Sequence, residues 1–149
     1  DVIGFISYLQ TKYKTTKMVV SNQTGVARKL FDCQRAEEIN QYIDAELSQK
    51  GIKIDNWQYC PDADAAYVEA KKDEIDFDYA FVKAQTKRKP STRMVDDGLK
   101  ELGRNISDFS KIIVIGDNEG CDGGLARNLN AKYIDVKGKS YDDLVREVG

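Results

Sequence analysis

The stretch from Lys111 to Asp122 constrains the fold of this chain more than any other. Its residues 112–115 read Ile-Ile-Val-Ile, an apolar and mostly β-branched run that is typical of a buried strand in a parallel sheet. Asp117 follows where open α/β sheets bind their ligands, and Asp122 lies five residues further on. Two hard carboxylate ligands at one strand end favour a divalent cation, Mg²⁺, beside a phosphate. The alternative is that Asp117 only caps the next helix, and the strand alone does not decide between the two.

Strands alternate with helices along the rest of the chain. Helical periodicity or helix-end signals mark residues 2–9, 35–49, 90–102, 123–130 and 141–148, and apolar runs mark strands near 18–20, 52–60 and 133–136. This alternation predicts an α/β fold with a Rossmann-like, three-layer parallel sheet and a minimal or absent cap. We expect one domain over residues 1–149. For the helix at 35–49 the pattern predicts an inner stripe of Ala36, Ile39, Tyr42, Ile43 and Leu47.

Composition excludes several kinds of chemistry. The chain has no histidine, which rules out a Ser-His-Asp triad, a histidine base and a His-ligated zinc site. A net charge of −2 gives no reason to expect nucleic acid as a partner. There is no run of 18 apolar residues and no visible secretory signal, so we expect no membrane association. Three cysteines, an odd number without a CxxC pair, favour a reducing compartment, and we expect a cytoplasmic location.

Three loops are expected to meet at one edge of this sheet, because right-handed crossovers place the ends of parallel strands together. The first, Ser21–Gly25, offers hydroxyl, amide and backbone donors for an anion, with Arg28 and Lys29 downstream. The second is the basic cluster Lys87–Pro90, and the third is the acidic turn 117–122. Each loop alone also reads as an ordinary turn or a solvated face. Their order along the chain is the stronger signal.

That order resembles the haloacid dehalogenase superfamily of phosphotransferases, and within it the histidinol-phosphatase and heptose-bisphosphate-phosphatase branch. Residues 19–28, Val-Val-Ser-Asn-Gln-Thr-Gly-Val-Ala-Arg, are similar to the second motif of that branch. Arg88-Lys89-Pro90 is similar to its third motif, and 115–122 to its fourth, an aspartate followed by a second acid. The resemblance covers most of the chain.

The resemblance also implies roles for individual residues. Ser21 and the backbone at Asn22 would bind the transferring phosphoryl group, and Lys89 would neutralise it. Asp117 would bind Mg²⁺, with Asp122 supporting the metal directly or through water. The residues implied for the substrate side are Arg28, Lys29, Arg88 and Asn118. Phosphoryl transfer needs this kind of positioning and charge stabilisation, with little other chemistry from the protein.

Two departures from the family pattern matter. The family attacks phosphorus with an aspartate of a first motif, which lies on a strand well before the second motif. Asp1-Val2-Ile3-Gly4 resembles that motif only faintly, so we expect that Asp1 is not the nucleophile and that the first motif is missing from these residues. Heptose-type members of that branch often carry a zinc loop between the second and third motifs, where this chain has Cys60-Pro61-Asp62. One cysteine cannot build a tetrahedral site, so we expect no zinc. The segment 62–85 would then be an insert, ordered by the packing of Tyr67, Phe77, Tyr79 and Phe81, that borders the site and influences substrate choice.

Three functions stay open at this point. The first is a Mg²⁺-dependent phosphatase that acts through an aspartyl-phosphate on a small metabolite, such as a sugar phosphate or histidinol phosphate. The second is a non-catalytic domain that keeps the phosphate and metal loops. The third is a polynucleotide 3′-phosphatase domain, which the charge balance disfavours because backbone binding needs a basic stripe. Oligomeric state cannot be read from these residues.

Overall fold

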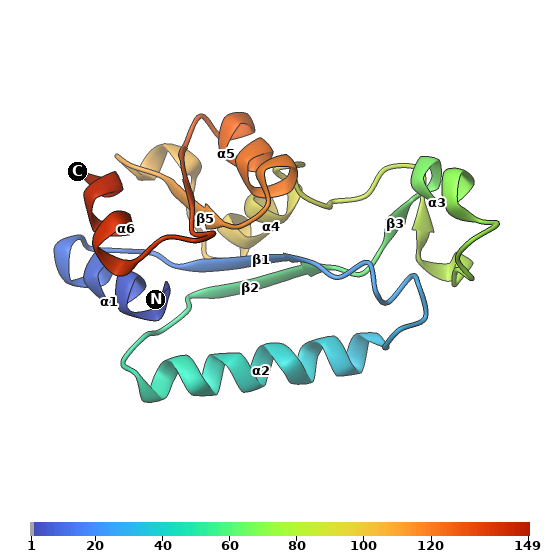
Figure 1. Cartoon of the computed structure of the whole chain (residues 1–149), viewed down its shortest axis with the longest axis horizontal. Helices are drawn as coiled ribbons and strands as arrows, with labels where there is room; N and C mark the ends of the chain where they lie inside the picture. The colour runs from blue at the N-terminus through green and yellow to red at the C-terminus, as the bar shows by residue number, and fades with distance from the viewer. Residues whose placement is uncertain (1) are drawn as a thin grey trace.

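A computed structural model describes residues 2–149; Asp1, expected not to be the nucleophile, lies outside them. The α/β expectation is confirmed, since short parallel strands alternate with helices (Figure 1). The strands are β1 (Met18–Asn22), β2 (Asn56–Cys60), β3 (Ala63–Asp64), β4 (Val82–Lys83), β5 (Ile113–Gly116) and β6 (Lys132–Asp135). The α-helices are α1 (Val2–Lys12), α2 (Cys33–Gln49), α3 (Ala65–Lys71), α4 (Arg93–Glu101), α5 (Gly124–Asn128) and α6 (Tyr141–Val148). None of the described helices is long and apolar enough to cross a bilayer.

The described strands form three two-stranded sheets, β1–β2, β3–β4 and β5–β6, rather than the one continuous three-layer sheet that the sequence predicts. All three pairs are parallel, and in the two longer ones the carboxyl ends Asn22 and Gly116 lie opposite Cys60 and Asp135. Burial is uneven. The apolar strands β1 and β5 contain no buried residue, whereas the more polar β2 and β6 each contain one or two.

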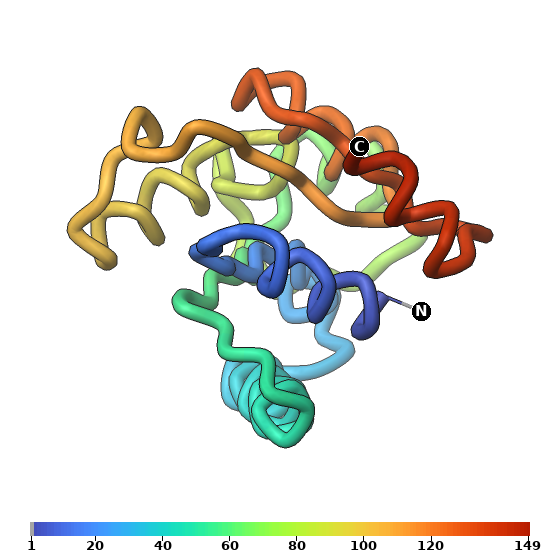
Figure 2. Tube along the Cα trace, turned by 90° about the vertical axis from the view of Figure 1, so that its left-hand side faces the viewer, coloured from blue at the N-terminus to red at the C-terminus, as the bar shows by residue number. Residues whose placement is uncertain are grey.

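Helices cover the β1–β2 sheet unequally. In Figures 1 and 2 α2 runs along one side of this sheet, set apart from the other helices. The close contact comes from α4, where Gly98 packs so tightly that a Cβ would meet the side chains of Met18 and Asn56 at 2.7–2.8 Å. Helix α6 packs against α1, and their apolar faces form one core with β6 through Phe5, Ile134 and Leu144.

The predicted inner stripe of α2 is wrong. Ile39, Tyr42 and Ile43 are 38%, 67% and 41% exposed, and of the stripe only Ala36 and Leu47 are buried. The inward face instead follows the spacing 36, 40, 44 and 47, with Asp44 accepting a hydrogen bond from the Trp57 indole N–H (3.2 Å). A polar contact has replaced the apolar one that periodicity alone would choose.

Two further expectations need correction. Pro90 does not open the helix that follows, because residues 90–92 form a turn and α4 begins at Arg93 after the cap residue Thr92. Within the 62–85 insert, Phe77 is buried with Ala27, Ala63 and Val68, and Phe81 packs against this cluster. Tyr79, however, is 64% exposed and orders nothing. The insert forms its own small unit of β3, α3 and β4 at one end of the molecule (Figure 1).

Candidate phosphate and metal site

Asn22, at the carboxyl end of β1, joins two of the three predicted loops. Its side-chain oxygen accepts a hydrogen bond from the Lys89 N–H at 2.8 Å, and its amide nitrogen donates to the Lys89 carbonyl at 3.2 Å. The same nitrogen lies 3.6 Å from the Cys121 sulfur in the third loop. The backbone of Lys89 is therefore held by β1, next to a cis Lys89–Pro90 peptide bond. Sequence reasoning missed this role, because it assigned only the backbone of Asn22.

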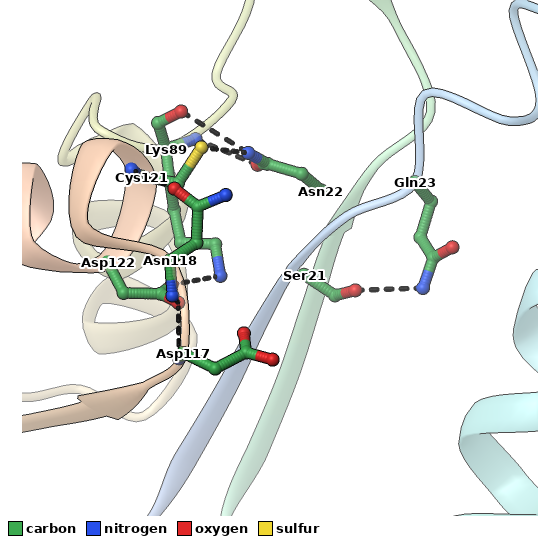
Figure 3. A network of polar contacts seen from close by, with 8 residues as sticks. All are labelled: Ser21, Asn22, Gln23, Lys89, Asp117, Asn118, Cys121 and Asp122. Carbon is green, nitrogen blue, oxygen red and sulfur yellow. Dashed lines mark hydrogen bonds and ion pairs between the residues drawn. The ribbon is translucent and has the colours of Figure 1, made fainter. Parts of the chain in front are cut away.

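Lys89 and Asp122 form the central ion pair, with 2.7 Å between Nζ and Oδ1. Their side chains are only 15% and 9% exposed. The other oxygen of Asp122 accepts from the backbone N–H groups of Asp117 and Asn118, both at 3.2 Å. Asp122 thus ties the second loop to the end of β5, as Figure 3 shows.

Asp117 projects from the end of β5 toward β1 (Figure 3). Its side chain is exposed, and its carboxylate makes no hydrogen bond or ion pair with residues 2–149. It does not cap the next helix: Asn118 does, because its side-chain oxygen accepts the Cys121 N–H at 2.9 Å and starts the π-helical turn η3 (Glu119–Gly123). The helix cap is therefore Asn118, and the carboxylate oxygens of Asp117 have no hydrogen-bond partner in the described chain.

The end of β5 is electrostatically negative. The pKa of Tyr133 on β6 is raised, first by burial and then by the carboxylates of Asp135, Asp122, Glu119 and Asp117. Among the described residues, the Tyr133 hydroxyl is a buried group without a hydrogen-bond partner. No three acidic or cysteine side chains within residues 2–149 converge to hold a metal ion by themselves. Mg²⁺ does not require such a cluster, since it keeps several waters and binds one or two carboxylates together with phosphate oxygens. Asp117 fits that need.

The remaining predicted residues are placed as follows. The Ser21 hydroxyl accepts a hydrogen bond from the Gln23 amide at 2.8 Å. Arg28 and Arg88 line one cavity next to the site, whereas Lys29 turns away and pairs with Asp76 of the insert at 3.1 Å. The side-chain oxygen of Asn118 is occupied by the hydrogen bond that caps η3. Sequence reasoning also assigned no role to Thr24 of the Ser21–Gly25 loop, whose hydroxyl accepts a hydrogen bond from the Arg88 Nε at 2.8 Å.

Comparison with known proteins gives relatives of one kind. The chain is 26% identical over 134 residues to a probable D-glycero-D-manno-heptose-1,7-bisphosphate 7-phosphatase of Thermoplasma acidophilum, covering 89% of this chain and 70% of that protein. It is 30% identical over 123 residues to the corresponding D-glycero-β-D-manno phosphatase of Photorhabdus laumondii, covering 82% and 58%. Both phosphatases are homologues of this chain. No protein-family profile matches it.

A solved structure shares the fold of this chain. The D,D-heptose 1,7-bisphosphate phosphatase of B. bronchiseptica, crystallised with magnesium and phosphate, superposes with a TM-score of 0.64 at 21% identity. The superposition covers 97% of this chain and 69% of that one. Relative to the curated proteins the chain is shorter, spanning 58% of the Photorhabdus protein and 38% of a Chlorobaculum tepidum relative.

Proposed function

We propose that this chain is the phosphate- and metal-binding part of a haloacid dehalogenase-type phosphatase that acts on a small phosphorylated sugar. The observation that carries the proposal is the Asn22–Lys89–Asp122 network, which brings three loops distant in sequence to one point. The names of the homologues, and the magnesium and phosphate of the B. bronchiseptica structure, support the substrate class and the cofactor.

In this proposal each residue has a limited task. Ser21 and the Asn22 backbone donate to the phosphoryl oxygens, while the Lys89 ammonium, held by Asp122, balances their charge. Asp117 supplies the protein carboxylate for Mg²⁺, which when bound would neutralise the phosphoryl group. Arg28 and Arg88 face the leaving group. Phosphoryl transfer is served mainly by such positioning and charge.

The proposal includes a nucleophilic aspartate outside residues 2–149 and a single sheet that contains both longer ladders. The uneven burial supports it. Strands β1 and β5 carry several apolar side chains but contain no buried residue, and both end at the site. A parallel strand between them would bury both and would end beside Lys89. In the described sheets β1 and β5 each pair with a single strand and so each has an open edge, which is why we propose that the strand with the nucleophile pairs between them.

The test separates phosphate binding from turnover. For the 149-residue chain, calorimetry should show inorganic phosphate binding that strengthens with Mg²⁺ and is lost in Asp117→Asn and Lys89→Met. Asp135→Asn, a carboxylate at the end of the neighbouring strand, is the matched control and should leave binding unchanged. Hydrolysis of a hexose phosphate is measured in parallel. Because the proposed nucleophile lies outside residues 2–149, binding without turnover is the expected result for this chain, and hydrolysis by a longer natural chain that contains such an aspartate would separate a phosphatase from the non-catalytic alternative. Phosphate binding that is indifferent to Mg²⁺ and to Asp117→Asn would contradict the proposal.

A further inference from the structure

A cavity of about 260 Å³ lies beside the Lys89 network and receives residues from three separate segments. It is lined by Thr24 and Arg28 after β1, by Ala63, Asp64 and Tyr67 of the insert, and by Arg88 next to Lys89. Because Arg88 and Lys89 are adjacent in sequence, a ligand whose phosphate reaches Lys89 would place its remaining part in or near this cavity.

The wall that holds Asp64 is firmly packed. Asp64 is the last residue of β3, next to Ala63, which is fully buried with Ala27, Val68 and Phe77. The Tyr67 ring meets Phe77 edge-on at 5.8 Å. One carboxylate oxygen of Asp64 accepts the backbone N–H of Thr86 at 3.1 Å, which ties β3 to the loop that carries Arg88. Asp64 therefore has a fixed position at the cavity.

The cavity is lined by more unpaired hydrogen-bond donors than unpaired acceptors among the described residues. Arg88 uses its Nε for Thr24, and its two terminal nitrogens have no partner within residues 2–149. The guanidinium of Arg28 has none either. The second oxygen of Asp64 also makes no bond in the described chain. The cavity thus offers many cationic donors and one carboxylate acceptor, which together match an acidic group with a hydroxyl next to it.

We propose that Asp64 is a specificity-determining residue, whose free carboxylate oxygen accepts a hydrogen bond from a hydroxyl of the leaving group. This hydroxyl is adjacent to an acidic group that Arg28 and Arg88 hold. The inference rests on the proposed function, and it selects phosphorylated polyols that carry a second acidic group beside a hydroxyl. It assigns a role to the insert that the motifs of the three loops do not contain.

Asp64→Asn is the sharpest substitution because the Thr86 N–H orients it. That N–H requires an acceptor, so the amide oxygen faces Thr86 and the NH₂ group faces the cavity. The substitution keeps the size and shape of the side chain while turning the acceptor into a donor. Asp62→Asn makes the same change of charge two residues away, outside the cavity lining, and serves as the matched control.

The experiment measures binding to the 149-residue chain with Mg²⁺ by calorimetry. The probes are 6-phosphogluconate, which has a hydroxyl beside its carboxylate, and 2-deoxy-6-phosphogluconate, which lacks it. The wild-type chain and Asp62→Asn should prefer the hydroxylated probe about ten-fold, the effect of one hydrogen bond to a charged group. In Asp64→Asn this preference should fall to about two-fold, because the NH₂ group can donate to the hydroxyl oxygen but the bond is no longer assisted by a charge. Binding of inorganic phosphate should stay unchanged in every variant, which also shows that each variant is folded.

Two failures are distinguishable. A wild-type chain without the preference, or an Asp64→Asn variant that keeps it undiminished, overturns the role of Asp64 even when inorganic phosphate binds normally. A wild-type chain that binds neither inorganic phosphate nor either sugar acid overturns the proposed function together with this inference.

Discussion

Lys89 and Asp122 form the ion pair at the centre of the candidate site, and their burial determines how much the pair contributes to stability. Asp122 as a whole residue is 6% exposed, and its carboxylate accepts hydrogen bonds from the Lys89 ammonium and from two backbone N–H groups. If the carboxylate is removed, water has little access to these three donors. The pair of Glu119 in η3 and Arg127 in α5 lies nearby in sequence, but both side chains are more than 60% exposed. Exposed ion pairs contribute little to stability, whereas breaking a buried pair leaves an uncompensated charge.

We therefore predict that Asp122→Ala lowers the free energy of unfolding by about 3 kcal/mol. Glu119→Ala should change it by less than about 0.5 kcal/mol. Urea denaturation followed by circular dichroism measures both variants under the same conditions. Equal losses in the two variants would show that the Lys89–Asp122 pair is not a special support of this loop.

Gly116 is the second residue with a sharp consequence, because a Cβ there would overlap the carboxylate of Asp122. That carboxylate is fixed by Lys89 and by two backbone N–H groups, so it cannot move aside without losing them. At Gly120, in η3, the nearest atom to an added Cβ is 3.5 Å distant. Steric need for glycine is thus present at the first position and absent at the second.

Gly116→Ala should weaken Mg²⁺-dependent phosphate binding at least ten-fold and destabilise the chain by about 2 kcal/mol, as is usual for overpacking. Gly120→Ala is the control and should retain wild-type affinity. Calorimetry with inorganic phosphate and urea denaturation provide the two readouts. If Gly116→Ala bound phosphate normally, the placement of Asp122 against the strand would be wrong.

At the scale of elements, the β5–β6 ladder contains a built-in comparison. Ile115 of β5 is paired with Ile134 of β6, and the two side chains have the same volume. Ile134 is fully buried in the core with Phe5 and Leu144, while Ile115 is only partly buried at its margin. The cost of truncation depends on the cavity left behind, so the two positions should differ.

Ile134→Ala should cost about 4 kcal/mol of stability and Ile115→Ala about 2 kcal/mol or less. Chemical denaturation of the two single variants gives the comparison directly. An equal loss at both positions would mean that β5 is as well covered as β6, contrary to the burial described here.

The order of elements was predictable because local signals repeat along the chain. Helix α6 has the predicted bounds, since Ser140 and Asp143 form a capping box at its start. Gly51 and Gly103 follow α2 and α4 with positive φ, which is the conformation that favours glycine just after a helix. The face of α2 was not predictable, because Asp44 finds its partner Trp57 only in the tertiary structure.

The candidate site shows the same division between local and tertiary information. Motif order identified the loops that meet, and the structure brings Asn22, Lys89 and Asp122 together. It does not bring Lys29 with them, because that residue has a positive φ and pairs with Asp76. The two-bond contact from the Asn22 side chain to the Lys89 backbone depends on distant chain segments, for which sequence spacing gives no signal.

At the scale of the whole molecule, charge limits the kind of phosphate ester that the proposed site would select. The chain carries 23 basic and 25 acidic side chains, for a net charge of −2. Nucleic-acid binding draws most of its affinity from many phosphate contacts and the release of counterions. The cationic groups at the candidate site are few: Lys89 pairs with Asp122, and Arg28 and Arg88 line one adjoining cavity of about 260 Å³. This arrangement suits a small ligand.

We predict that a sugar phosphate displaces inorganic phosphate from the chain more strongly than a 3′-phosphorylated oligonucleotide does at about 0.15 M salt. The affinity for the oligonucleotide should fall with salt no more steeply than expected for one or two phosphate contacts, a slope of log K against log salt of about −1 to −2. Competition calorimetry at three salt concentrations measures both quantities. Arg88→Gln should weaken binding of the sugar phosphate without making the dependence of log K on log salt steeper. Tighter binding of the oligonucleotide with a slope of about −4 or beyond would favour a nucleic-acid end as the substrate instead.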